Sequence, residues 1–344
     1  MTSSFLRFAI KRILLTVPVL LGISVIIFIL TRSIGNPVTV YITNPQGLTP
    51  EAIQQLIKIH HLDEPLYIQY FYWLSDAFHG DLGYSVSAGL PVTDAILTFF
   101  PNTIELTSVS LGLAVLFGIV SGKYSAVHRN RLGDHALRFV ALYGVSTPVF
   151  WLGIILLYFF FGMLGIAAFS PGPYTESLFI NHHIKLYTRF LIIDAILNGD
   201  PAFLVDVLAH LLLPALALSY ASMAIIMRMM RSSMLEVLGQ QYVQVARSKG
   251  LTAKQVVQRH VVRNAMLPTT TVIGLSAGFL LGGSVLVETV FRYPGLGFWA
   301  AAAILRLDHA AVVGLALLAG IVYVTINLVV DIAYAYLDPR VSLG

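Results

Sequence analysis

The sequence contains no cysteine and has few charged residues. The absence of cysteine excludes a disulfide scaffold, a thiolate metal site and a cysteine nucleophile. Charged residues make up 11% of the 344 residues, whereas soluble domains carry about 25%. Apolar residues reach 57%, so a folded chain of this composition has too little charge to cover its surface in water. The composition indicates an integral membrane protein.

The sequence also lacks the Gly-x4-Gly-Lys-Ser/Thr loop that cradles the phosphates of ATP. Energy for any active process must therefore come from another chain or from an ion gradient. We expect no catalytic residue, no metal site and no cofactor on this chain.

Six long uncharged stretches are present. About 20 apolar residues are needed to cross the hydrocarbon core, and an open sheet edge is not stable in lipid, so each stretch predicts a helix. We expect one all-α membrane domain over residues 1–344. Its six predicted spans are 9–31, 104–122, 138–162, 207–227, 268–290 and 310–334.

The basic residues predict the orientation of these spans. Most of the 21 Lys and Arg residues lie on one side of the membrane if the N-terminus is inside, and the positive-inside rule then favours N-in and C-in. The first stretch follows Arg7, Lys11 and Arg12 and could be a signal peptide. Its apolar run is longer than usual and Arg32–Pro37 is a poor cleavage site, so we interpret it as a retained span.

Two predicted outer segments, 32–101 and 170–206, have structure of their own. Thr49-Pro50-Glu51 is typical of a helix start, and Asp63-Glu64-Pro65 predicts a second one. The aromatic residues that follow suit a membrane interface or a small folded cap. The apolar run Leu191–Leu197 is too short to cross, and we expect it to be interfacial or packed.

The predicted inner segment 228–267 is the most informative. Met234, Leu238, Tyr242 and Val245 recur at helical spacing and predict one apolar stripe. Gly250 then predicts a helix stop, and Thr252 to Gln255 fits a capping box that opens a new helix, which Pro268 restricts. Two basic helices joined at a glycine corner exceed what a connector needs. We therefore interpret this segment as a docking element for a partner.

At these residues the sequence resembles the transmembrane permeases of binding-protein-dependent ABC importers, in particular the B-type subunits of the dipeptide/oligopeptide branch. Tyr242–Leu251 with Arg263–Pro268 is similar to that branch's EAA loop. The Glu-Ala-Ala triplet that gives the loop its name would fall on Gln244-Val245-Ala246, and only Ala246 matches it. Further similar motifs run through the chain: Leu62–Leu66, Gly80–Ser85, Phe291–Gly297 and Leu337–Arg340.

The resemblance implies a type I ABC importer permease fold in the cytoplasmic membrane of a prokaryote. It implies two ATP-binding subunits that bind ATP and Mg, a second homologous permease, an extracytoplasmic solute-binding protein, membrane lipid and no nucleic acid. The substrate would be a peptide, with an oligosaccharide or nickel as alternatives. The implied ATPase-coupling residues are Gln244, Ala246, Arg247, Lys249, Gly250, Leu251, Arg263, Asn264 and Pro268.

Three alternatives compete with this interpretation. An ion-coupled transporter would use acidic residues within the membrane, and the candidate polar path residues are Glu288, Asn327 and Asp331. Against this alternative, the acids Glu105, Glu288 and Asp331 lie at the edges of uncharged runs, where we expect them to reach water. A serine hydrolase is suggested by Gly274–Gly278, but that motif needs a strand-turn-helix context. A metal site is suggested by the paired histidines at 60–61 and 182–183, which we interpret as surface residues.

Overall fold

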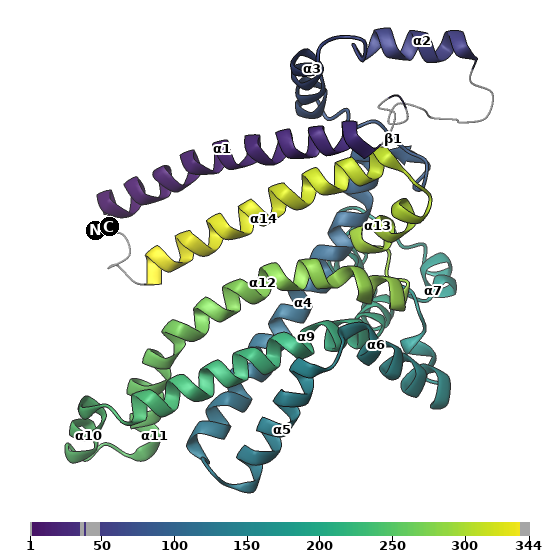
Figure 1. The fold of residues 1–344 in the computed structure, drawn as a ribbon. Helices are drawn as coiled ribbons and strands as arrows, with labels where there is room; N and C mark the ends of the chain where they lie inside the picture. The colour runs from purple at the N-terminus through teal and green to yellow at the C-terminus, as the bar shows by residue number, and fades with distance from the viewer. Residues whose placement is uncertain (1, 35–37, 39–48, 338–344) are drawn as a thin grey trace. The chain divides into compact units, whose positions relative to one another are not determined.

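Figure 1 shows the computed structural model, which describes residues 2–34, 38 and 49–337. The described chain is almost entirely helical. The helices are α1 (Thr2–Ile34), α2 (Pro50–Ile59), α3 (Leu66–Phe78), α4 (Val92–Val127), α5 (Leu132–Ser146), α6 (Val149–Leu157), α7 (Glu176–Asn181), α8 (Leu191–Leu197), α9 (Pro201–Leu238), α10 (Gln241–Ser248), α11 (Ala253–Val256), α12 (Arg263–Phe291), α13 (Leu296–Leu305) and α14 (His309–Leu337).

Short non-α elements complete the chain. The elements η2 (Tyr158–Met163) and η4 (Val257–Val262) are π-helices, and η3 (Ala167–Phe169) is a 3-10 helix. The strands β1 (Tyr84–Ser85) and β2 (Leu90–Pro91) pair antiparallel, with Tyr84 opposite Pro91. Both predicted starts in the outer loop are present. Thr49 caps α2 by accepting from Ala52 N at 3.3 Å, and α3 begins directly after Pro65.

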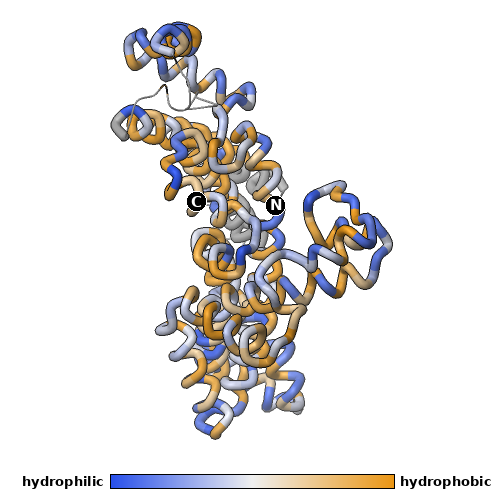
Figure 2. The backbone as a smooth tube through the Cα atoms, turned by 90° about the vertical axis from the view of Figure 1, so that its right-hand side faces the viewer, coloured by the Kyte–Doolittle hydropathy of each residue, from blue (hydrophilic) through white to orange (hydrophobic). Residues whose placement is uncertain are grey.

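Five described helices are long and apolar enough to cross a membrane. They are Ile10–Arg32, Val92–Val127, Pro201–Leu238, Ala253–Phe291 and His309–Leu328. A bent pair, Leu132–Ser146 with Val149–Met163, provides a sixth span if it is counted as one. Figure 2 shows hydrophobic residues concentrated along the helical segments and hydrophilic residues at many turns. Each predicted span overlaps one of these helices or the bent pair.

The predicted uninterrupted helix 138–162 is corrected by the structure. The chain bends by 106° between α5 and α6, at Thr147 and Pro148. Proline disfavours the helical conformation of the residue before it and has no N–H to donate. Thr147 accordingly has extended backbone, with φ −88° and ψ 125°, and ends α5. A charge count alone does not detect such a break, because both halves are apolar.

The chain forms two compact units, residues 1–102 with 294–344 and residues 103–293, and the division falls within α4. In the first unit, α1 and α14 pack together, and Ile27, Phe28, Trp73 and Val313 form one of its buried clusters. A second cluster joins the start of α4 to α13 and α14 through Val92, Trp299 and Ala311.

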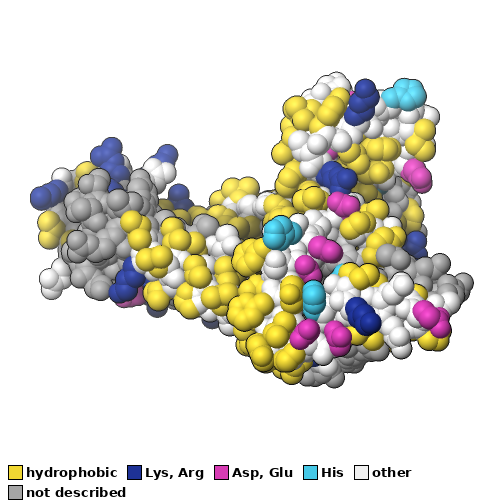
Figure 3. All heavy atoms as spheres, turned by 90° about the horizontal axis from the view of Figure 1, so that it is seen from above, with side chains coloured by type: hydrophobic (Ala, Val, Ile, Leu, Met, Phe, Trp, Pro, Cys, Tyr) yellow, Lys and Arg dark blue, Asp and Glu magenta, His cyan; other side chains and the backbone are white. Residues whose placement is uncertain are grey.

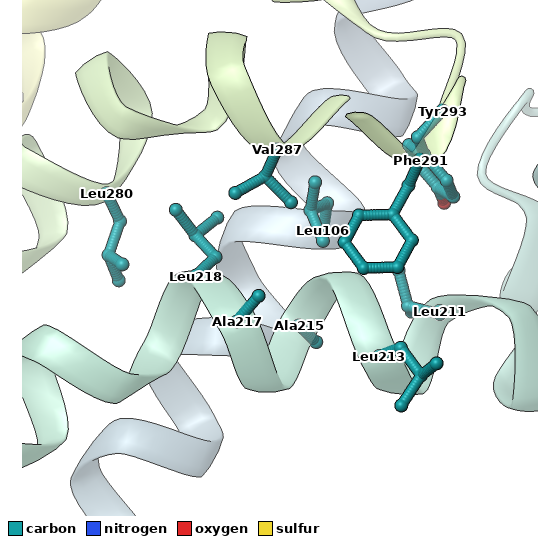
Figure 4. Packing of buried hydrophobic residues seen from close by; sticks show 10 residues of the cluster. All are labelled: Leu106, Leu211, Leu213, Ala215, Ala217, Leu218, Leu280, Val287, Phe291 and Tyr293. Atoms are coloured by element: carbon teal, nitrogen blue, oxygen red, sulfur yellow. The ribbon is translucent and has the colours of Figure 1, made fainter. Parts of the chain in front are cut away.

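In the second unit, α9 is the central helix and packs along α12. Figure 4 shows the cluster between them, with Leu218, Leu280 and Val287 facing one another and Leu106 of α4 beside them. The N-terminal part of α9 contributes Leu211 and Leu213, and the ring of Phe291 lies near them. Apolar packing of this kind holds helices together in lipid through close contact.

The approach of α4 to α9 depends on two glycines in α4. A Cβ at Gly118 would lie 2.8 Å from Cγ2 of Ile226, and a Cβ at Gly122 would lie 2.7 Å from the carbonyl oxygen of Met227. Both distances are too short for any side chain. Small residues allow membrane helices to approach this closely, and here they bring α4 into contact with the backbone of α9.

Candidate functional site

The candidate site is the helical corner 239–263, defined here as the segment from the end of α9 through α10, Gly250 and α11 to η4. In Figure 1, α10 and α11 lie together beyond the last turns of α9. Gly250 has φ +81°, a left-handed conformation that glycine adopts without strain. Thr252 and Gln255 then form the predicted capping box, with the Gln255 side chain 2.9 Å from Thr252 N. The predicted glycine corner is therefore present.

The corner is anchored by apolar side chains on its inner side. Val243 and Ala246 of α10 are buried, as is Val256 of α11. They pack in one cluster with Met230 and Met234 of α9. Ala126, Val261 and Ala265 complete this cluster, and Leu251 packs against it. The corner is thus held against the helices of its own unit.

The predicted stripe of Met234, Leu238, Tyr242 and Val245 is corrected in part. Met234 is buried, but α9 ends at Leu238 and α10 begins a separate helix at Gln241. The break between the helices shifts the buried face, so that Val243 and Ala246 point inward while Tyr242 and Val245 are 44% and 53% exposed. An apolar pair is therefore displayed on the outer side of the corner.

The predicted coupling residues surround this exposed pair. Gln244, Arg247, Lys249 and Gly250 are exposed, whereas Ala246 is buried and Leu251 is half-buried. Arg247 lies in the last turn of α10, where a cation is favoured by the helix dipole. The outer surface of the corner thus combines positive charge with two apolar side chains.

The remaining predicted coupling residues lie where η4 joins α12. Arg263 and Asn264 are exposed, and the Asn264 side chain donates to His260 O at 2.7 Å. Pro268 was expected to restrict the helix, but it lies inside α12, and the span continues from Ala253 to Phe291. Membrane helices tolerate an internal proline because neighbouring groups satisfy the freed backbone carbonyl.

The candidate acids within the membrane differ from expectation. Glu288 and Glu105 were expected to reach water from the span ends, but Glu288 is fully buried and Glu105 is 6% exposed. Thr103 donates to Glu288 at 2.8 Å. Glu105 accepts from the backbone N of Leu191 at 3.1 Å and of Ile192 at 2.7 Å. This carboxylate therefore caps the first turn of α8, which explains how the short run 191–197 is held.

The other two candidate path residues are on α14. Asn327 is exposed, and its side chain donates within its own helix to Tyr323 O at 3.0 Å. Asp331 is part of α14, but its side chain lies outside the described residues, as do Asp338–Arg340 of the terminal motif.

The sequence interpretation missed a buried ion pair in the second unit. Asp134 at the start of α5 is fully buried, and Arg231 of α9 binds both of its oxygens at 2.8 Å. Ser125 of α4 and the backbone N of Asn130 also donate to Asp134. One carboxylate thus joins three helices. Asp134 and Arg231 are 97 residues apart in the sequence, and the only signal for this contact is that their charges are opposite.

A second polar cluster in the first unit was also missed. Asp308 accepts at 2.7 Å from the Ser85 hydroxyl and from both the backbone and the hydroxyl of Ser87. Its other oxygen accepts from Ala311 N at the start of α14, at 3.2 Å. Trp299 donates to Ser87 at 3.1 Å. These contacts hold the β1–β2 hairpin against α13 and α14.

Neither the serine hydrolase nor the metal site gains support in the described part of the chain. Gly274–Gly278 lies inside α12, without the strand and turn that a serine nucleophile requires. No group of three or more His, Cys, Asp or Glu residues there is arranged to hold a metal. Figure 3 shows acidic and histidine side chains interspersed with hydrophobic ones on the face viewed from above.

Comparison with known proteins identifies the family. The binding-protein-dependent transport system inner membrane component matches residues 114–343, and the N-terminal region of such membrane components matches residues 5–107. The chain belongs to this family of permeases. It is an all-α, multi-pass protein of the bacterial inner membrane with the type I ABC importer permease fold, and it acts in a transport system with other subunits.

The similar relatives cover nearly the whole permease. The probable D,D-dipeptide transport system permease protein DdpB of Escherichia coli K12 is 42% identical over 95% of this chain and 94% of its own. The dipeptide transport system permease protein DppB of the same strain is 38% identical over 98% of each chain. The di/tripeptide permease DppB of Pseudomonas aeruginosa UCBPP-PA14 is 39% identical, again over 98% of each.

Proposed function

We propose that this permease is one of two membrane subunits of an ATP-driven importer of short peptides, and that the corner 239–263 docks on an ATP-binding subunit. The observation that carries the docking is the division of the corner into two faces. Val243 and Ala246 fix its inner face to the permease, while Tyr242, Val245 and Arg247 stand outward. The names of the relatives, which are dipeptide and di/tripeptide permeases, support the substrate class.

The mechanism needs a partner that binds the corner differently in two conformations. A ligand with equal affinity for both conformations does not change the equilibrium between them, however tightly it binds. Two ATP-binding subunits that hold ATP and Mg and close on each other would supply this difference. The corner would pass their movement to α9 and α12, because its inner face packs on both helices. A solute-binding protein would deliver the peptide from outside, and a homologous second permease would complete the path.

The test is uptake of a labelled dipeptide into proteoliposomes that contain the complete transporter. Arg247→Glu reverses a charge on the outer face, and Gly250→Pro forbids the φ of +81° at the corner. We expect both variants to insert in the membrane and to lose at least tenfold in uptake. Gly239→Ala is the matched control, because Gly239 has φ −81° on the same corner and tolerates a side chain.

The same assay separates the proposal from an ion-coupled transporter. Uptake should stop when ATP is withdrawn and should continue when an ionophore dissipates the ion gradients. Uptake that persists without ATP would refute the proposed coupling. Normal uptake by both single variants, Arg247→Glu and Gly250→Pro, would refute it as well. Failure of dipeptide uptake with intact ATP hydrolysis would refute the substrate alone.

A further inference from the structure

An apolar groove of about 550 Å³ lies in the second unit between α4, α5 and α9. Phe117 and Val120 line it from α4, Leu137 and Val140 from α5, and Met223 and Met227 from α9. Its volume falls within the range of about 300–1,000 Å³ that is typical of ligand sites. All three helices belong to membrane-spanning segments.

The groove is open along its rim and closed at its floor. Phe117, Val120 and Val140 on the rim are 43% to 57% exposed. Ala141, Ala224 and Met227 on the floor are buried and pack as one cluster. Water has too few polar partners in such a space to fill it favourably. A hydrocarbon chain meets both conditions, because it is apolar and reaches the rim from the surrounding bilayer.

Positive charge is concentrated at one end of this groove. Tyr124 and Gly133 mark the end that adjoins the turn 128–131 between α4 and α5, and Tyr124 stacks on His128 of that turn at 4.3 Å between ring centroids. Arg129 and Arg131 lie in the turn and are exposed. No ion pair involves either arginine in the part of the chain that the structure describes.

The local acid does not neutralise this charge. Asp134 is the only Asp or Glu between Glu105 and Glu176 in the sequence. Both of its oxygens are bound by Arg231 at 2.8 Å, so the pair has no net charge. Basic sites beside membrane helices bind the headgroups of anionic lipids. An apolar groove that ends at two free cations therefore matches an acyl chain with a negative headgroup.

We propose that this groove is a binding site for an anionic phospholipid, with an acyl chain between α4, α5 and α9 and its phosphate on Arg129 and Arg131. None of the residues that line the groove belongs to the docking corner 239–263. It would fix the lipid at the turn where Asp134 and Arg231 join three helices, so that bound lipid stabilises the same junction.

The test uses the absence of native cysteine, since Ser121→Cys places one unique fluorophore on the groove wall. The purified permease is titrated in detergent with phosphatidylglycerol that carries brominated acyl chains, which quench the fluorophore. Phosphatidylcholine with the same chains is titrated in parallel. We expect saturable quenching by phosphatidylglycerol at roughly tenfold lower concentration. A label at Ile154→Cys on α6, exposed and outside the groove, is the control.

Two sets of variants separate headgroup from chain. Arg129→Gln combined with Arg131→Gln should weaken the binding of phosphatidylglycerol roughly tenfold, to the level of phosphatidylcholine. Ala136→Phe, at an exposed position in the groove, should abolish saturable quenching by both lipids, and Val140→Trp serves if that variant fails to fold.

Three results would overturn the proposal. If the two lipids bind equally well, and the arginine variants do not change their binding, the headgroup site is excluded. Competition by free glycerol phosphate as strong as by the lipid would assign the charge to a phosphate site without a chain. Loss of quenching at position 121 on assembly of the complete transporter in phosphatidylglycerol membranes would show that another subunit covers the groove.

Discussion

The carboxylate of Asp134 has no contact with solvent, and its bidentate partner Arg231 comes from a different helix. Removal of one member of a buried ion pair leaves the other charge without compensation, which costs about 3–5 kcal/mol. Arg231→Met should therefore lower the free energy of unfolding by about 3 kcal/mol, measured by thermal unfolding in detergent. Asp134→Leu combined with Arg231→Met should restore most of this loss, because no buried charge remains.

If Arg231→Met alone is as stable as the native permease, the junction of α4, α5 and α9 does not depend on this pair. Arg228→Met is the matched control. It removes a positive charge one turn earlier on α9, from an exposed side chain, and should change stability by less than about 0.5 kcal/mol.

Asp200 shows how one residue makes a helix start sensitive to pH. Its carboxylate caps α9 by accepting from Phe203 N at 2.9 Å, and His182 lies 2.5 Å from it. The hydrogen bond from Phe203 and then that from His182 lower the pKa of Asp200 below its ordinary value. A lowered carboxyl pKa adds stability that is present above the ordinary pKa and is lost as pH falls through the folded-state value.

We therefore expect the deficit in unfolding temperature of Asp200→Asn relative to the native permease to be largest at pH 7 and to shrink as pH falls below the ordinary carboxyl pKa of about 3.9, because Asn keeps a neutral capping oxygen but not the charge. Asp200→Ala removes the oxygen as well and should be less stable than Asp200→Asn at every pH. An Asp200→Asn deficit that does not change with pH would show that ionisation of the cap makes no contribution.

At the scale of helices, α4 offers a test of close packing with an internal control. A Cβ at Gly122 would lie 2.7 Å from Met227 O, whereas a Cβ at Gly112 meets nothing within 4 Å. Gly122→Ala should separate α4 from α9 and cost about 1–3 kcal/mol, measured by thermal unfolding in detergent. Gly112→Ala should be neutral or stabilising, since alanine favours helix by about 1 kcal/mol over glycine. Equal stability of the two variants would contradict the proposed contact.

The elements also show what the sequence could predict. Local signals were sufficient for the helix starts at Thr49 and Thr252 and for the turn at Gly250, because each depends on a few adjacent residues. The bend at Pro148 is equally local, but it lies within an uncharged run, so the spacing of charges does not reveal it. The exposed side of α10 differs from the predicted stripe, because the apolar period of α9 does not continue beyond the end of that helix.

At the scale of the whole molecule, the composition and the apolar runs predicted the all-α membrane fold, and the motifs predicted the family that the comparisons show. The contacts of the buried acids could not be predicted in this way. Glu105 meets α8, 86 residues later, and Asp308 meets Ser85, 223 residues earlier. Contacts at such separation depend on which helices pack together, and a single sequence gives no measure of that.

The cap that Glu105 places on α8 limits how the outer part of this permease can move. If α4 shifted while α8 stayed in place, the amides of Leu191 and Ile192 would lose their acceptor in apolar surroundings. Each stranded donor costs about 1–3 kcal/mol, which adds directly to the barrier for such a shift. The helix α8 must therefore move together with α4 as one rigid body. A transport cycle consequently has fewer independent moving pieces than it has helices.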